Sequence, residues 1–131
     1  MNTGMRIAAL AACLFACVAL PTRAADRIHA GQWDTTLDVN GRTMAMSACI
    51  PQSEADAMNG DVASIRAAIE KSTAPTGCKV LDVRVNAGEV RVMSSCAGKE
   101  TVGTTTYHGD TAETVSSNGT KALARRVGPC K

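Results

Sequence analysis

Four cysteines in the last two thirds of the chain, Cys49, Cys78, Cys96 and Cys130, constrain its fold more than any other feature. The chain has only one Trp, one Tyr and one Phe, so a core built from large aromatic side chains is not available to it. Small exported domains with poor cores are commonly stabilised by disulfides, and an even number of cysteines favours complete pairing. We therefore expect two disulfides, for which three pairings are possible.

The N-terminal residues 1–25 have the three parts of a secretory signal peptide. Arg6 provides a charged start, residues 7–20 are uncharged and mostly apolar, and Ala24 and Ala25 offer small residues for cleavage. Cleavage after Ala25 would leave a single disulfide-stapled domain, residues 26–131, and cleavage after Ala24 would leave one residue more. The apolar run is shorter than the roughly 20 residues needed to span a bilayer, so no transmembrane span is expected.

The predicted destination is the periplasm, where thiols oxidise. An alternative treats Leu10 to Cys13 as a lipobox, which would anchor the chain by a lipid on Cys13. Only a short apolar stretch precedes Cys13 and no polar tether follows it, so the cleaved and secreted form is favoured.

Charge argues against nucleic acid as a partner. The chain has 14 Lys and Arg against 12 Asp and Glu, and removing Arg6 and Arg23 with the leader leaves 12 against 12. Without a basic field or aromatic stacking platforms, the domain lacks what nucleic-acid binding uses.

A hairpin argument favours one pairing of the cysteines. Cys78 and Cys96 lie at mirror-image positions around Asn86 to Gly88, where a three-residue loop with a left-handed glycine would bring them together. Cys49 would then pair with Cys130. The valines indicate a different register, because an apolar face forms when Val83 lies opposite Val92 and Val85 opposite Val90. This register is shifted by one residue from the one that the cysteines require, and a β-bulge could reconcile the two.

The first predicted hairpin spans residues 31–50. Residues 31–39 alternate in polarity, and Asn40-Gly41 is a strong two-residue turn signal. This loop sets Trp33 opposite Ala48, Thr35 opposite Met46 and Leu37 opposite Met44, on one face that we expect to be buried.

A short helical insertion is expected after Pro51. Residues 53–56 resemble a capping box, Asn59-Gly60 is a stop signal, and Asp61 can cap a second helix. An apolar stripe on that second helix, Val62, Ile65, Ala68 and Ile69, should pack against the sheet.

Further strands are predicted at 80–85, 90–93, 101–107, 111–117 and 120–127, from their Val and Thr content and the turns between them. Short connections favour antiparallel neighbours. The predicted class is α+β and sheet-dominant, an antiparallel meander of about seven strands, curved or barrel-like, with the helices between strands 2 and 3 lying on its concave side.

An ordered set of short motifs runs through the domain: Gly31-Gln32-Trp33-Asp34, Cys49-Ile50-Pro51, Cys78-Lys79-Val80, Ser95-Cys96, Tyr107-His108-Gly109-Asp110 and Arg126-Val127-Gly128-Pro129-Cys130. With these motifs the chain resembles the exported bacterial domain-of-unknown-function family 3617 from about Gly31 to Lys131. Residues 53–57 match the family's acidic and alanine-rich segment only after a shift of a residue or two. The resemblance implies an exported protein with four linked cysteines, and it brings no catalytic residues.

No catalytic constellation is found, so an enzyme is not expected, and neither is a cofactor or metal site. His108 beside Asp110 fits a solvated turn, and His29 fits a flexible residue before the first strand. Met44 and Met46 share a strand face and could bind monovalent copper, but their spacing equally suits a hydrophobic core, which we favour.

Tyr107, Lys121, Arg125 and Arg126 form a candidate recognition surface near the final hairpin, on the premise that the last strand is an edge strand. The competing interpretation is that charges on such an edge serve only to discourage strand addition. The function expected is a non-enzymatic binding or envelope-associated module for an unknown protein or a small apolar ligand. The alternative is an inhibitor of an envelope-active enzyme such as a lysozyme or protease.

Overall fold

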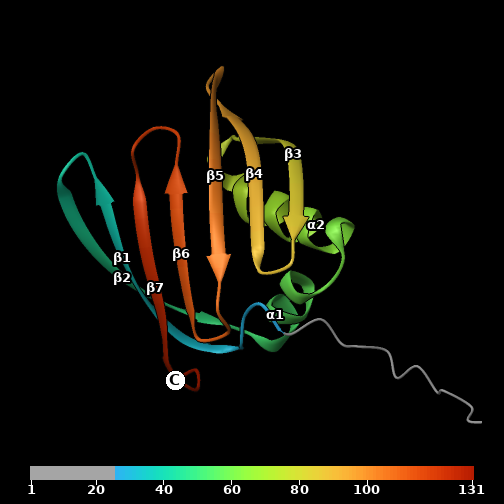
Figure 1. The fold of residues 1–131 in the computed structure, drawn as a ribbon, viewed down its shortest axis with the longest axis vertical. Helices are drawn as coiled ribbons and strands as arrows, with labels where there is room; N and C mark the ends of the chain where they lie inside the picture. The colour runs from blue at the N-terminus through green and yellow to red at the C-terminus, as the bar shows by residue number, and fades with distance from the viewer. Residues whose placement is uncertain (1–25) are drawn as a thin grey trace, which may run out of the picture.

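A computed structural model describes residues 26–131, so the predicted signal peptide and Cys13 lie outside the described residues. Seven strands and two α-helices follow one another in the order that the polarity pattern predicts (Figure 1). The elements are β1 (Gly31–Val39), β2 (Arg42–Ile50), α1 (Gln52–Asn59), α2 (Val62–Thr73), the 3-10 turn η1 (Ala74–Thr76), β3 (Lys79–Asn86), β4 (Glu89–Cys96), β5 (Lys99–Tyr107), β6 (Thr111–Ser116) and β7 (Lys121–Gly128).

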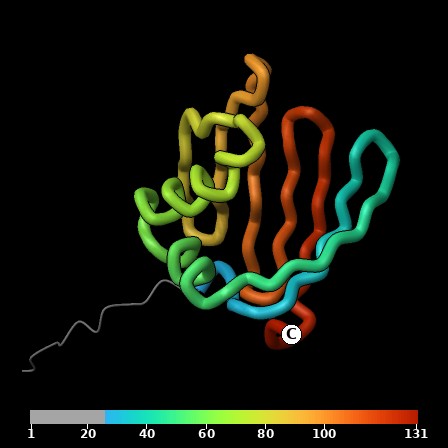
Figure 2. Tube along the Cα trace, turned by 180° about the vertical axis from the view of Figure 1, so that it is seen from behind, coloured from blue at the N-terminus to red at the C-terminus, as the bar shows by residue number. Residues whose placement is uncertain are grey.

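The strands form one antiparallel sheet in the order β2-β1-β7-β6-β5-β4-β3. From β3 to β7 the chain is a meander, and β7 then pairs with β1, which brings the first hairpin beside the last strand. The sheet is curved and does not close into a barrel, and both helices lie on its concave side (Figure 2). This confirms the predicted fold class.

The first hairpin has the predicted register. Trp33 lies opposite Ala48, Thr35 opposite Met46 and Leu37 opposite Met44. Asn40 and Gly41 both adopt left-handed conformations, with φ of 53° and 77°, as a type I′ turn requires.

The second hairpin combines the valine register with a bulge. Val83 pairs with Val92 and Val85 with Val90, and the register shifts between Val80 and Asp82. The expected three-residue loop is wrong: the turn is Ala87-Gly88, and Ala87 takes the positive φ, 50°. Gly88 comes close to the end of β5, since a Cβ at this position would lie 3.0 Å from the Tyr107 carbonyl oxygen.

The helices begin differently from one another. Asp61 caps α2 as predicted, its Oδ1 accepting a hydrogen bond from the Ser64 N–H at 2.8 Å, and this bond lowers the Asp61 pKa. The predicted capping box at Ser53 is wrong, because α1 starts earlier, with Pro51 at the N-cap and no side-chain cap. No helix within residues 26–131 combines the length and apolar character required to cross a membrane.

The core consists of two clusters on the helix side of the sheet. Trp33 packs with Ala55 of α1 and Ala112 of β6, and Ile65 of α2 packs with Val83 and Val90. Ile65 is fully buried, whereas Val62, at the start of the predicted apolar stripe, is 45% exposed. Arg66 ties α2 to the sheet, because its guanidinium donates to the Val80 carbonyl at 3.2 Å.

Candidate functional site

Half of the helix-side face of the sheet has no helix above it. Along one row of register partners that crosses six strands, Met44 is 50% exposed at one end and Val90 is 2% exposed at the other. Between them lie Leu37, Ala122, Thr114 and Thr105, all half-buried. Exposure therefore rises along this row with distance from α2. We call the bare half of this face, formed by Leu37, Met44, Met46, Ala122 and Thr114, the open face.

The exposure of Met44 and Met46 contradicts the expectation that this whole face of the first hairpin is buried. Trp33 is 3% exposed because α1 covers it, but Met46 is 54% exposed. The helical insertion is short and packs over β3, β4 and the lower end of β1, so it does not reach the upper end of the first hairpin (Figure 2). The methionines are therefore accessible surface rather than core.

The opposite face of the sheet, the outer face, also exposes apolar side chains. Leu123 is 58% exposed and Val115 is 56% exposed. In register, however, Leu123 lies beside Glu113, and Val115 lies beside Lys121. Apolar and charged side chains thus alternate on the outer face, as on an ordinary solvated surface.

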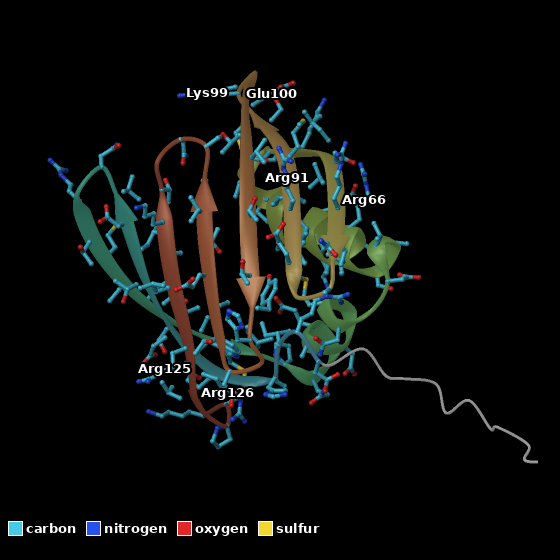
Figure 3. All side chains as sticks on the ribbon, viewed as in Figure 1. Arg66, Arg91, Lys99, Glu100, Arg125 and Arg126 are labelled. Carbon is cyan, nitrogen blue, oxygen red and sulfur yellow. A yellow bond between two sulfur atoms is a disulfide. The ribbon has the colours of Figure 1, made fainter. Side chains whose placement is uncertain are left out.

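Charge separates the two faces. By register, every carboxylate of the described strands points to the outer face: Asp34, Asp38, Asp82, Glu89, Glu100 and Glu113. The charged strand residues on the helix-side face are all basic, namely Arg42, Lys99 and Arg126. Lys99 stands at the upper tip of β5 (Figure 3), and Arg42 follows the turn at the tip of the first hairpin.

The four residues of the candidate recognition surface do not share one face. Lys121 and Arg125 are exposed on the outer face, whereas Tyr107 and Arg126 belong to the helix-side face. The edge-strand premise is wrong, because β7 lies between β1 and β6. Tyr107 packs against both core clusters, and this burial raises its pKa above 10.0.

Arg126 has a structural role at the covered end of the face. Its Nε donates to the Ala30 carbonyl at 2.6 Å, and its guanidinium lies over Gly31. Gly31 has φ 146°, and a side chain there would collide with the Gly128 carbonyl and with Arg126. Only glycine fits this position.

Residues 27–29, just before β1, are held by hydrogen bonds, whereas His29 was expected to be flexible. Arg27 donates to the carbonyls of Ala87, Met58 and Gly60 at 2.7, 3.1 and 3.1 Å. His29 Nδ1 lies 2.8 Å from Asp110 Oδ1, a contact that the sequence does not indicate. These contacts hold residues 27–29 against the C-terminal end of α1, the β3–β4 turn and the β5–β6 turn.

A hollow of about 550 Å³ adjoins this segment, lined by residues that include Asp26, Arg27, His29 and Tyr107. The Arg27 guanidinium and the His29 imidazole in this lining already bond to protein groups. Within residues 26–131, no group of three His, Cys, Asp or Glu side chains is placed to hold a metal ion.

The disulfides join Cys49 to Cys130 and Cys78 to Cys96, the partners that the hairpin argument favoured. Their Cα atoms are 5.3 and 4.3 Å apart. The first bridge ties the end of edge strand β2 to the C-terminal residues, and the second closes the region between η1 and β4.

A family model described as "Protein of unknown function (DUF3617)" matches residues 28–130, which is nearly all of the described chain. No curated protein and no solved structure matches the chain.

Proposed function

The chain belongs to the DUF3617 family, and we propose from its geometry that it is a non-catalytic binding module that holds an anionic amphiphile, an apolar chain with an acidic head group, on the open face. The observation that carries this proposal is the pair Met44 and Met46, each about half exposed on a sheet face that has no carboxylate on its strands.

Apolar contact would supply the affinity. Met44 and Met46 flank Leu37 and Thr35 of β1, and Ala122 of β7 continues the surface toward β6. Small side chains at Ala122 and Thr114 leave room above the middle of the sheet. Methionine is unbranched and polarisable, so it adapts to flexible apolar chains.

The distribution of charge favours an anionic head group. Arg42 and Lys99 lie at the same end of the sheet, because the β1–β2 and β4–β5 turns are both at that end (Figure 1). A ligand whose apolar chain lies along the methionines could place an acidic group near this basic rim. A cationic amphiphile would meet like charge there.

We place this function outside the cytoplasm. Two disulfides suit an oxidising compartment, and the pattern of residues 1–25 is that of a signal peptide. The inhibitor alternative stays a prediction, and a pull-down with purified lysozymes and proteases tests it.

The test is displacement of a fluorescent fatty acid from the full chain, expressed with its own N-terminal segment and recovered from an oxidising compartment. A long-chain fatty acid should compete, whereas the amine of the same chain length should compete at least tenfold less well. Burial of two half-exposed methionines contributes about 1 kcal/mol each. The double variant Met44→Gln/Met46→Gln should therefore bind the probe roughly 30-fold more weakly.

Leu123→Gln is the matched control. It removes an equally exposed apolar side chain from the outer face and should leave binding unchanged. Equal loss in the control and the methionine variant would refute the proposal, as would equal competition by acid and amine.

A further inference from the structure

The two edges of the sheet differ in how they are protected. The β3 edge has a register shift between Val80 and Asp82, it carries Lys79, Asp82 and Arg84, and Arg66 donates to its Val80 carbonyl. Bulges, charges and covering side chains are the usual means of preventing strand addition at an edge. The β3 edge is therefore guarded.

Between Thr43 and Ala48 the β2 edge has none of these protections, while Arg42 and the Cys49–Cys130 disulfide lie at its two ends. Its pairing with β1 runs without a register shift from Ile50 to Arg42, and residues 43–50 contain no charged residue and no proline. Every residue of β2 except Ile50 is exposed. Figure 1 shows β2 as the outermost strand of the first hairpin. A long, regular, uncharged edge of this kind is a template for another strand.

The turn geometry determines which backbone groups of β2 are free. A two-residue type I′ loop places its flanking residues, Val39 and Arg42, in a hydrogen-bonded pair. Because antiparallel pairs alternate, even-numbered residues of β2 bond to β1. The N–H and C=O groups of Thr43, Ala45, Ser47 and Cys49 therefore point away from the sheet.

We propose that β2 pairs with β2 of a second copy of this chain, antiparallel and about a two-fold axis at Met46. In this register Ala45 bonds to Ser47 of the second copy, and Thr43 bonds to Cys49 of the second copy. All four outward-pointing residues are then paired. A shift by two residues in either direction leaves at least one of them without a partner.

Side chains in the same register are compatible with self-association. Met46 packs against Met46 of the second copy, and Met44 lies opposite Ala48 of the second copy. Arg42, the one charged residue of β2, faces Ile50 of the second copy, so no like charges meet. The strand is thus complementary to itself, which favours a second copy over an unrelated peptide.

This pairing goes beyond the proposed function and does not depend on it. It would join the two sheets edge to edge with their helix-side faces on the same side, so both open faces would still face solvent and would meet at Met46. A chain that dimerises without binding amphiphiles, or the reverse, would separate the two ideas.

The test uses single cysteine variants of the full chain, recovered from an oxidising compartment. At the two-fold axis Met46 forms a non-hydrogen-bonded pair with Cα atoms about 4.5 Å apart, within the range that a disulfide spans. Met46→Cys should therefore give a covalent dimer with oxidised glutathione. Met44→Cys is the matched control, equally exposed and on the same strand, and its two thiols would lie on Cα atoms about 14 Å apart.

The expected result is at least tenfold more covalent dimer for Met46→Cys than for Met44→Cys, with intact masses that retain both native disulfides. Sedimentation of the unmodified chain should show a concentration-dependent dimer. Ala45→Pro removes one outward N–H without touching the bonds to β1, and should weaken that dimer at least tenfold. A chain that remains monomeric at all concentrations, or preferential linkage through Met44→Cys, would overturn the proposal.

Discussion

The two disulfides should contribute unequally to stability, and the difference can be worked out from the loops they close. The Cys49–Cys130 bridge spans 81 residues, and the Cys78–Cys96 bridge spans 18. Loop-closure entropy then gives a loss of about 4.5 kcal/mol when the first is removed and about 3 kcal/mol when the second is removed. The measurement is urea unfolding of the variants Cys49→Ser/Cys130→Ser and Cys78→Ser/Cys96→Ser.

The long-range pair is the cleaner test, because Cys49 and Cys130 are both exposed and their replacement by serine leaves no cavity. A domain of this size has a free energy of unfolding of about 5–15 kcal/mol, so the variant should fold with little margin. At about 4 °C per kcal/mol, its melting temperature should fall by about 18 °C. If the Cys78→Ser/Cys96→Ser variant loses as much stability or more, loop length is not the origin of the effect.

Three substitutions and one titration test the core and the N-terminal segment. Ile65→Ala should lower the free energy of unfolding, measured in urea, by about 3 kcal/mol because Ile65 is fully buried. Val62→Ala, at an exposed position of the same helix, should change it by less than about 0.5 kcal/mol. Tyr107 is the one tyrosine of the chain, and burial raises its pKa in the folded state, so an ultraviolet titration should give a midpoint above 10.0. The free energy of unfolding should be unaffected by this group below about pH 10 and should decrease above it. A midpoint at the ordinary value would contradict the burial of Tyr107. Arg27→Gln removes charged donors from three carbonyls and should cost about 2 kcal/mol; an unchanged urea midpoint would mean that the segment is not held by these bonds.

Local sequence patterns predicted the structure correctly wherever residues close together in the chain set the geometry. Asn40-Gly41 determines the register of the first hairpin, since a two-residue turn allows only one alignment of its flanking strands. Asp61 predicts the start of α2 because its carboxylate can reach the N–H of Ser64. The conflict between the cysteine and valine registers of the second hairpin likewise indicated a bulge, and the structure has it between Val80 and Asp82.

The predictions from sequence were wrong where the environment of a residue is set by a segment far away in the chain. Met44 and Met46 have the spacing of core residues, and nothing near them shows that the helices stop short of their end of the sheet. His29 and Asp110 are 81 residues apart, so their contact has no local signal. The same holds for β7, which has the charge pattern of an edge strand but lies between β1 and β6.

By itself, the sequence determined the strand and helix order, the register of the first hairpin and the class of the fold, because turn chemistry and polarity alternation act over a few residues. Only the tertiary structure decided which half of the sheet the helices cover, that β7 is interior, and that β2 is an open edge. These features depend on how elements of fixed length are placed on a curved sheet, and no local pattern encodes that placement.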